Sequence, residues 1–375
     1  MASKKTIPYG HQWLDSDDIK EVVKVLKGDW LTQGPKVEEF EKAVAKYCKV
    51  KYAVAFSSGT SALHGAYMAT GIGKGDEVIT TPLTFAATSN ILYFCGAKPV
   101  FADIERDTLN INPLLVEGLI TKKTKAIVTV DFAGNPCNYD EILSLAKKHK
   151  LLVIEDACHA LGAKYKGKKV GSFADMTVFS FHPVKHITTG EGGMVLTDNE
   201  DFFKKLKVLR SHGIVKQPEK GGWYYQIENP SFNYRLTDIQ SALGLSQLKK
   251  LDKFIMRRRE IVEIYHKSFK DIKNLILPKE SAGSFSAWHI YPVQIIGKER
   301  REFFEQLKKN GIGVQVHYMP LHLHPFYQKE YGYKVGDFPV AEEYYRKTVT
   351  LPLFPKMTNS DIKKVIQITK KYATN

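Results

Sequence analysis

The feature that most constrains the fold is an alternation between short apolar runs and helix-like stretches over residues 51–157. Stretches such as YDEILSLAKKHK, at 139–150, have the apolar spacing of a helix. The apolar runs are YAVAFSS, DEVITTP, KPVFADI, TKAIVTVDFAG and LLVIEDA. Strands that alternate with helices predict a largely parallel sheet covered on both faces, because such runs are too apolar for a sheet wetted on one side. We therefore assign the chain to the α/β class.

Two more apolar segments, SFADMTVFSFHPVK and GGMVLTD, predict further strands downstream of this region. The chain then reads as helical over residues 198–213 and again over residues 237–269. Thr237 or Asp238 is a plausible N-cap for the second helix. This helix is predicted to be long enough to link two domains.

A smaller α+β pattern follows beyond about residue 270. It consists of a strand (288–296), a helix (301–311), a strand (313–318) and a closing helix (359–373). We predict a large domain over residues 1–250, in which residues 1–35 contribute to the active site. A small C-terminal α+β domain is predicted over residues 251–375.

The net charge of +15 is compatible with nucleic-acid binding, because Lys and Arg neutralise phosphates. The lysines are scattered over helical segments such as SLAKKHKLL and FFEQLKKN, a pattern typical of solvated helix faces. A substrate that carries a diphosphate would gain from the same positive field. We therefore expect a small anionic substrate and no nucleic acid.

The N-terminal stretch MASKKTIPYGHQWLDSDD lacks the apolar core of a signal peptide, and no later run is long and apolar enough to cross a bilayer. We expect a cytoplasmic protein with no membrane partner.

The four cysteines, Cys48, Cys95, Cys137 and Cys158, are widely spaced without a CxxC pair. This spacing indicates neither a disulfide framework nor a metal site, so buried thiols are expected.

The most informative segment is SFADMTVFSFHPVKHITTGEGG, which contains Lys185. An apolar strand is followed by a single lysine and then by a glycine-rich turn, where the backbone can pass close to a ligand. A lysine in such a setting can form a Schiff base. The alternative for a lysine taken alone is an ordinary surface residue.

Asp156 is the last residue of the apolar run LLVIED, at the strand end where open α/β sheets present ligand-binding residues. A buried carboxylate needs a cationic partner, and a protonated pyridine nitrogen would serve. The alternative is that Asp156 caps a helix formed by ACHALG.

A third segment, FSSGTSALHGA, leads from a strand directly into a helix. Free N–H groups at the start of a helix, with the hydroxyl groups near Gly59 and Thr60, can hold a phosphate, although Ser and Thr caps are also common without one. Phe85 follows another strand end and could lie flat on an aromatic cofactor. As an isolated phenylalanine it would belong to the core.

Together these segments closely resemble the DegT/DnrJ/StrS sugar aminotransferase family of fold-type I pyridoxal phosphate enzymes. The resemblance spans nearly the whole chain, and its motifs are LTQGPKVEEFE, SSGTSAL, TFAAT, EDACHALGA, SFHPVK with TTGEGG, LRSHG, NYRLTDIQSALGLSQL and VHYMPLH. It implies pyridoxal 5'-phosphate as cofactor and a twofold homodimer with shared active sites.

The resemblance also implies roles for single residues. Lys185 would carry the cofactor and move a proton between substrate and cofactor. Asp156 would hold the pyridinium nitrogen and His159 would contact the phenolic oxygen, while Phe85 would stack on the ring. The phosphate would be held by Gly59, Thr60, Ser180 and, from a second subunit, Asn233.

Within the family, IPYGHQWLDSDD, DWLTQGP, FSFHPVKHITT and LGLSQLKK are most similar to members that act in pseudaminic acid biosynthesis. Those members use L-glutamate to aminate the 4-keto group of a UDP-linked 2-acetamido-2,6-dideoxy-L-hexose. The implied substrate contacts are Tyr9, Asp29, Trp30, Leu31, Thr32, Ser58, Ser180, Asn233, Val316, His317, Tyr318 and Met319. His317 and Tyr318 also fit an ordinary strand end.

Three alternatives remain at this point. The acceptor could be another UDP- or dTDP-linked 4-keto-6-deoxysugar. Some relatives are dehydratases with histidine at the cofactor lysine, a reaction disfavoured here by Lys185. A regulatory protein with a degenerate aminotransferase domain should carry a separate helix-turn-helix module, for which the short stretch before LTQGP leaves no room.

Overall fold

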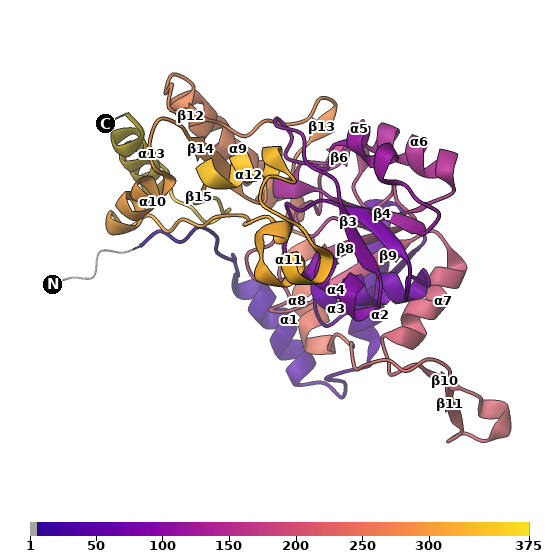
Figure 1. The fold of residues 1–375 in the computed structure, drawn as a ribbon. Coiled ribbons are helices and arrows are strands. Elements are labelled where there is room, and N and C mark those ends of the chain that lie inside the picture. Colours follow the sequence, from indigo (N-terminus) through magenta and orange to yellow (C-terminus); the bar gives the residue numbers. More distant parts are fainter. Residues whose placement is uncertain (1–5, 375) are drawn as a thin grey trace.

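A seven-stranded sheet forms the centre of the computed structural model, which describes residues 6–374 (Figure 1). Its strands, in spatial order, are β1 (Tyr52–Phe56), β9 (Gly193–Thr197), β8 (Met176–Ser180), β5 (Leu152–Asp156), β4 (Thr124–Val130), β2 (Glu77–Thr80) and β3 (Lys98–Phe101). Strand β9 runs antiparallel to both of its neighbours, and all other neighbouring pairs are parallel. The predicted α/β class and mostly parallel sheet are confirmed, with every strand within a predicted apolar run.

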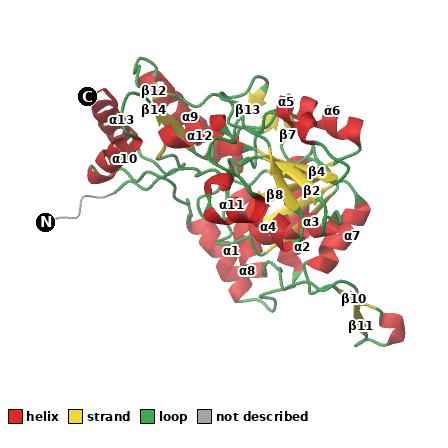
Figure 2. Ribbon diagram, in the orientation of Figure 1, coloured by secondary structure: helices red, strands yellow, loops and turns green. Residues whose placement is uncertain are grey.

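Helices cover both faces of this sheet, as the red and yellow elements of Figure 2 show. One face packs against α3 (Gly59–Ala69), α4 (Ala87–Phe94) and α7 (Glu200–Leu209). The other face packs against α2 (Pro35–Cys48) and α6 (Tyr139–His149). Side chains alternate between the faces along a strand: Val54 of β1 joins the first cluster, and Ala53 and Ala55 join the second.

The helix predicted over 237–269 is in fact two helices, α8 (Asp238–Leu248) and α9 (Leu251–Phe269), so the single long helix was wrong. Thr237 is the N-cap, because its hydroxyl accepts a hydrogen bond from the Gln240 N–H at 3.2 Å. The break lets α8 pack against α1 (Ser16–Leu26) and α2 while α9 crosses to the C-terminal core. Tertiary packing therefore overrides a continuous helical pattern.

The C-terminal region forms a three-stranded sheet in the order β12 (Leu275–Ile276), β14 (Tyr291–Ile295) and β15 (Thr348–Leu351). Helices α10 (Arg300–Lys309) and α13 (Asn359–Thr374) pack near it, as the periodicity predicts. The strand predicted over 313–318 was wrong, because only Gln315 pairs there, in an isolated bridge to Thr350. The Gly313 N–H instead bonds to the Ile7 carbonyl at 2.7 Å, so this segment runs as an irregular connection.

Two C-terminal helices, α11 (Pro325–Tyr331) and α12 (Pro339–Lys347), pack beside the large sheet, and α12 also contacts β14 of the small one. Tyr327 and Tyr344 share an apolar cluster with Leu83 and Phe101. Helix α9 likewise contributes to both the large and the C-terminal core. The boundary between domains at residues 250 and 251 stays a prediction.

A hairpin of β10 (Ile214–Lys216) and β11 (Tyr225–Ile227) projects away from the rest of the molecule (Figure 1). It carries the exposed side chains of Trp223 and Tyr225. The remaining short elements are α5 (Pro113–Val116), β6 (Lys164–Tyr165), β7 (Lys168–Lys169) and β13 (Ser284–Phe285). Across residues 6–374, none of the helices combines the length and apolar character required to span a bilayer.

Candidate active site

A cavity of about 510 Å³ lies where the carboxyl ends of β1, β5 and β8 meet, the edge at which α/β sheets present their ligands. Tyr9, from the N-terminal segment, and His289, from the C-terminal half, complete its wall. The predicted residues that it gathers are Tyr9, Ser58, Gly59, Thr60, Phe85, Asp156, His159, Ser180, Lys185, His317 and Tyr318. One cavity thus collects most of the predicted cofactor set and part of the predicted substrate set.

Lys185 lies in the turn after β8, where its backbone N–H donates to the His182 carbonyl at 2.9 Å. The side chain is half-buried and lines the cavity, and its Nζ has no hydrogen bond or ion pair with any residue in 6–374. Burial lowers the pKa of this amine, partly offset by Cys158 and Asp156. A less protonated amine is the state in which a lysine acts as a nucleophile and a base.

Asp156 ends β5 and is 6% exposed. Its Oδ2 accepts a hydrogen bond from the Thr88 hydroxyl at 2.7 Å, and its Oδ1 accepts one from the Cys158 N–H at 3.2 Å. The alternative reading as a helix cap was wrong, because residues 157–163 form turns and no helix. The carboxylate has no ion-pair partner among the described residues, so it can take a cation from a ligand.

The first turn of α3 presents free backbone donors to the cavity. Ser58 is the N-cap: its hydroxyl accepts from the Ser61 N–H at 3.1 Å, which leaves the N–H groups of Gly59 and Thr60 without a helical acceptor. A Cβ at Gly59 would lie 2.9 Å from the Ser180 Cβ, so only glycine lets these two strand ends approach. This arrangement suits an anion such as phosphate.

His159 and Tyr318 form part of the opposite wall. The Tyr318 hydroxyl and His159 Nε2 share a hydrogen bond at 3.3 Å, while His159 Nδ1 is buried without a partner in the described chain. Burial, together with Lys185, lowers the pKa of His159 well below its ordinary value, so its imidazole is neutral.

Phe85 is 58% exposed and its ring centroid lies 6.0 Å from that of Tyr318. It lines the cavity and is not a core residue, so the alternative reading was wrong. An aromatic ring exposed on a cavity wall is available for stacking on a planar ligand.

Tyr9 and His317 lie side by side, with ring centroids 5.4 Å apart. His317 Nδ1 bonds to the Thr350 hydroxyl at 2.9 Å, and burial lowers the pKa of His317 to about 4. His317 therefore serves as a neutral hydrogen-bonding group at neutral pH.

The other predicted residues lie outside this cavity in the single chain. Asp29, Trp30, Leu31 and Thr32 are all exposed in the connection between α1 and α2. Asn233 is also exposed, next to the projecting hairpin, and its side-chain oxygen accepts from the Arg235 N–H at 3.3 Å. Val316 and Met319 flank the cavity residues His317 and Tyr318 along the chain. Their roles stay predictions.

The cavity also contains residues that sequence reasoning missed, namely Leu63, Thr84, Ala87, Val130, Cys158, His182, Val184, Glu191 and His289. Thr84 lies in the bend before α4, and its hydroxyl lies 2.8 Å from that of Thr88 in the first turn of the helix. Helical spacing therefore gave no signal for Thr84. His289 carried no signal either, since it is far in sequence from every other cavity residue except those of segment 317–318.

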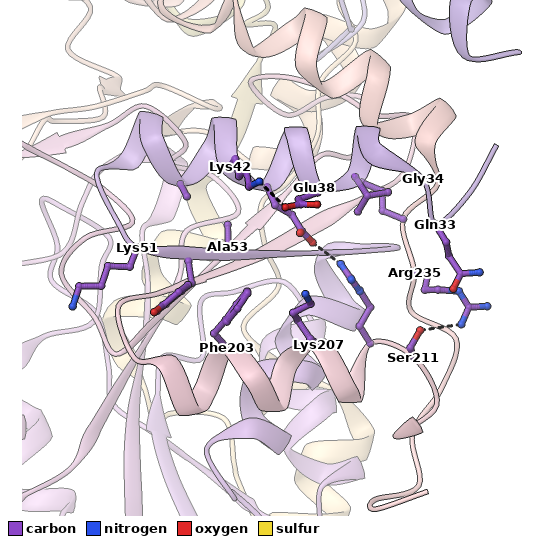
Figure 3. Close-up of a pocket in the computed structure, with 16 residues that line it drawn as sticks. Gln33, Gly34, Glu38, Lys42, Lys51, Ala53, Phe203, Lys207, Ser211 and Arg235 are labelled. Atoms are coloured by element: carbon purple, nitrogen blue, oxygen red, sulfur yellow. Dashed lines mark hydrogen bonds and ion pairs between the residues drawn. The ribbon is translucent and has the colours of Figure 1, made fainter. Parts of the chain in front are cut away.

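A second cavity of about 500 Å³ lies along the free edge of β1, between α2 and α7 (Figure 3). It is rich in cations, but Lys42 pairs with Glu38 at 2.6 Å and Arg210 pairs with Glu41. Arg235 donates to the Ser211 hydroxyl at 3.1 Å. Lys51 and Lys207 are exposed at its rim. None of the residues with a predicted role lines this cavity.

Comparison with known proteins supplies the deciding observation. Residues 12–370 match the model of the DegT/DnrJ/EryC1/StrS aminotransferase family. The chain belongs to this family. The match confirms the resemblance to this family inferred from the sequence motifs, and the protein is an aminotransferase dependent on pyridoxal 5'-phosphate.

Several individual family members are similar over nearly their full length. The spore coat polysaccharide biosynthesis protein SpsC of Bacillus subtilis is 45% identical, with 97% of this chain and 96% of that protein covered. A UDP-4-amino-4,6-dideoxy-N-acetyl-beta-L-altrosamine transaminase of Campylobacter jejuni is 45% identical, with 95% of each covered. The structure of Helicobacter pylori PseC, an aminotransferase involved in pseudaminic acid biosynthesis, superposes with a TM-score of 0.93 at 37% identity, covering 98% of this chain and 99% of that one.

The residues of the cavity around Lys185 fit the cofactor of this aminotransferase family. A carboxylate without a cation, a helix start with free N–H groups and a lysine nitrogen without a partner line the same space. They match the pyridinium, the phosphate and the reactive carbon of pyridoxal phosphate in turn. The exposed ring of Phe85 provides a flat apolar surface beside them.

Proposed function

We propose that the protein transfers the amino group of L-glutamate to the 4-keto group of UDP-2-acetamido-2,6-dideoxy-β-L-arabino-hexos-4-ulose. The products are 2-oxoglutarate and UDP-4-amino-4,6-dideoxy-N-acetyl-β-L-altrosamine, the amino sugar of pseudaminic acid synthesis. The observation that carries the proposal is the unpartnered Lys185 nitrogen in one cavity with the uncompensated Asp156 carboxylate. The names of the Campylobacter and Helicobacter relatives support this sugar.

When bound, pyridoxal phosphate supplies an electron sink for the carbon that loses a proton. Lys185 holds and moves that proton at Nζ, and burial lowers the pKa of this amine, which favours the unprotonated form that accepts a proton. Asp156 keeps the pyridine nitrogen protonated, and the Thr88 hydroxyl holds the Asp156 carboxylate in place. The same lysine serves both halves of the reaction, so neither half proceeds without it.

The remaining site residues act by binding in this proposal. Gly59, Thr60 and Ser180 hold the phosphate, His159 contacts the phenolic oxygen and Phe85 stacks on the ring. The sugar nucleotide contacts Ser58, Ser180, Tyr9, His317 and Tyr318, which line the cavity. Its further contacts in this proposal are Asp29, Trp30, Leu31, Thr32, Asn233, Val316 and Met319.

The active unit is a homodimer with shared sites. Asn233 is exposed beside the hairpin β10–β11, whose side chains Trp223, Tyr225 and Ile227 are also exposed. Apolar side chains on a projecting arm are typical of a surface that a partner covers. In a twofold dimer this arm would bring Asn233 to the phosphate of the other site. All four cysteines are free, which is compatible with action in the cytoplasm.

The alternative acceptor is a different nucleotide-linked 4-keto-deoxysugar, which the similarity to SpsC supports because that protein is named for another polysaccharide.

The test is a mass-spectrometric assay in which the purified protein receives L-glutamate and either the UDP-linked 4-keto sugar or a dTDP-linked 4-keto-6-deoxyglucose. The proposal predicts that the UDP-linked keto sugar is converted to a UDP-linked amino sugar only when glutamate is present. Amination of the dTDP-linked sugar alone would establish the alternative acceptor. Binding of the cofactor without any amination would contradict both.

A further inference from the structure

His289 is held rigidly against the cavity by its own backbone. Its N–H donates to the Ala133 carbonyl at 2.8 Å, and its carbonyl accepts from Arg258 Nη1 at 3.0 Å. Arg258 is fully buried and also donates to the Trp288 and Leu353 carbonyls. The position of the imidazole is therefore set before any ligand arrives, as a binding site requires.

The imidazole of His289 has no partner for either of its nitrogens among residues 6–374. The residue is only 5% exposed, and its Nδ1 is completely shielded from solvent. A buried polar group without a hydrogen bond is costly, and such groups are rare away from functional sites. Because His289 lines the active-site cavity, a bound molecule can supply the missing partner.

His186 provides a direct contrast in the same region. It is similarly buried and its Nδ1 also lacks a partner in the described chain, but its Nε2 bonds to the Ala287 carbonyl at 3.2 Å and it does not line the cavity. The ring of His289 lies 5.6 Å from that of His186 and only 4.3 Å from that of His159. His289 is thus the histidine that extends the His159 wall of the cavity.

The charged and titratable groups that face His289 are Lys185, His159, His186 and Arg258. All four are bases, while the carboxylates of Asp156 and Glu191 line other parts of the same cavity. Burial first, and these four bases second, lower the pKa of His289 well below its ordinary value. The imidazole is therefore neutral and can donate one N–H bond to an anionic oxygen. Within the described chain, the histidines also form no cluster suited to a metal ion.

We propose that His289 is a further cofactor-binding residue, which donates a hydrogen bond to the anionic ring oxygen beside the carbon that Lys185 engages. It acts next to His159, so two neutral imidazoles face that oxygen. The inference rests on the proposed placement of the cofactor at Lys185. Neither the family match nor the sequence motifs assign a role to this residue.

The experiment follows the visible absorption band of the bound cofactor as the pH is changed, in the holoenzyme. A donor to the ring oxygen stabilises its negative charge, most strongly in the form that has lost its proton. Its removal must therefore raise the pH midpoint of the band. His289→Phe should raise the midpoint by about one pH unit, since a shift of that size is the effect of one hydrogen bond to a charged group. His289→Asn, which retains a donor, should restore part of the shift.

The matched control is His186→Phe, which removes another buried imidazole close to Lys185 and should leave the midpoint unchanged. His289→Leu replaces His289→Phe if the larger ring prevents folding, which circular dichroism reports. An unshifted midpoint in the folded His289 variants, or an equal shift in His186→Phe, would overturn the inference while leaving the proposed function intact. Absence of a cofactor band in the unaltered protein would overturn both.

Discussion

Two cavities of this molecule have nearly the same volume, about 510 Å³ around Lys185 and about 500 Å³ along the edge of β1. They differ in how their polar groups are paired. Among residues 6–374, the Lys185 nitrogen and the imidazole of His289 have no hydrogen-bond partner. The Asp156 carboxylate accepts hydrogen bonds from Thr88 and Cys158 but has no ion-pair partner there. In the edge cavity, Glu38 and Glu41 neutralise two of the cations.

This difference shows that volume and charge do not identify a functional site. Folding tends to satisfy polar groups, and single exceptions such as Arg210 Nε also occur in the edge cavity. Several unsatisfied groups around one cavity, together with an unpaired lysine and carboxylate, indicate that a ligand completes them. The edge cavity has the larger number of cations, but Arg210, at the end of α7, pairs with Glu41 of α2, and Lys42 pairs with Glu38 within α2. Each cavity therefore predicts a different response to substitution.

The largest expected effect is that of Lys185→Ala. The account predicts that kcat/KM falls by at least about 10³-fold, because the residue both carries the cofactor and moves the proton. Lys207→Ala, in the edge cavity, is the matched control and should leave kcat/KM unchanged. Steady-state kinetics with glutamate and the keto sugar would check this, and an equal loss in both variants would erase the distinction between the cavities.

Asp156→Asn should have the next largest effect. The amide cannot keep the pyridine nitrogen protonated, so kcat should fall by about 10²-fold, a typical loss when one electrostatic contact at a reacting group is removed. Glu38→Gln removes a carboxylate from the edge cavity, where the exposed pair with Lys42 is worth only about 0–1 kcal/mol. Retention of full kcat by Asp156→Asn would refute the role of this carboxylate.

The pH dependence of folding should reflect the buried histidines of the active-site cavity. The pKa of His317 is about 4 in the folded protein, below its value in the unfolded chain, so the unfolded state binds more protons between these values. The free energy of unfolding should therefore fall as the pH drops from about 6.5 towards 4. At pH 5, His317 alone would account for up to about 2 kcal/mol.

Urea unfolding of the wild type and of His317→Asn at pH 7 and pH 5 measures this contribution. The variant should lose less stability between the two values than the wild type does. His322 is also buried but bonds to Glu342 at 2.9 Å, so His322→Asn serves as the comparison outside the cavity. An unchanged pH dependence in His317→Asn would show that His317 is already satisfied when charged.

The smallest effect on catalysis should come from breaking the ion pair at the edge cavity. Glu41→Gln leaves Arg210 without its carboxylate, and both side chains are largely buried. We expect the free energy of unfolding to fall by about 1–3 kcal/mol, the range for a charged hydrogen bond that loses one partner. The value of kcat should stay close to that of the wild type. Loss of activity without loss of stability would instead give this cavity a functional role.

Much of the fold was predictable because its strands are buried on both faces and therefore appear as continuous apolar runs. All seven strands of the central sheet lie within such runs. The break between α8 and α9 was not predictable, because the helical pattern continues through Lys249 and Lys250 and only packing against α1 and the C-terminal core separates the two helices. The missing strand at 313–318 similarly reflects a bond to the N-terminal segment.

The site residues also differ in how far the sequence could predict them. Lys185, Asp156 and Gly59 were predictable because each follows a strand, and the carboxyl ends of parallel strands meet at one edge. His289 was not, because its place depends on the Ala133 carbonyl and the buried Arg258, which are distant in sequence. Asn233 and residues 29–32 were predicted from family motifs, and because they are exposed in the single chain their roles stay predictions.

The most direct test of the central claim is to reduce the holoenzyme with borohydride and map the lysine that retains the cofactor by peptide mass spectrometry. The account predicts that the label lies on the peptide containing Lys185, and that Lys185→Ala carries none while Lys207→Ala is labelled normally. A label on another lysine, or no label in the wild type, would contradict the assignment of the active site to this cavity.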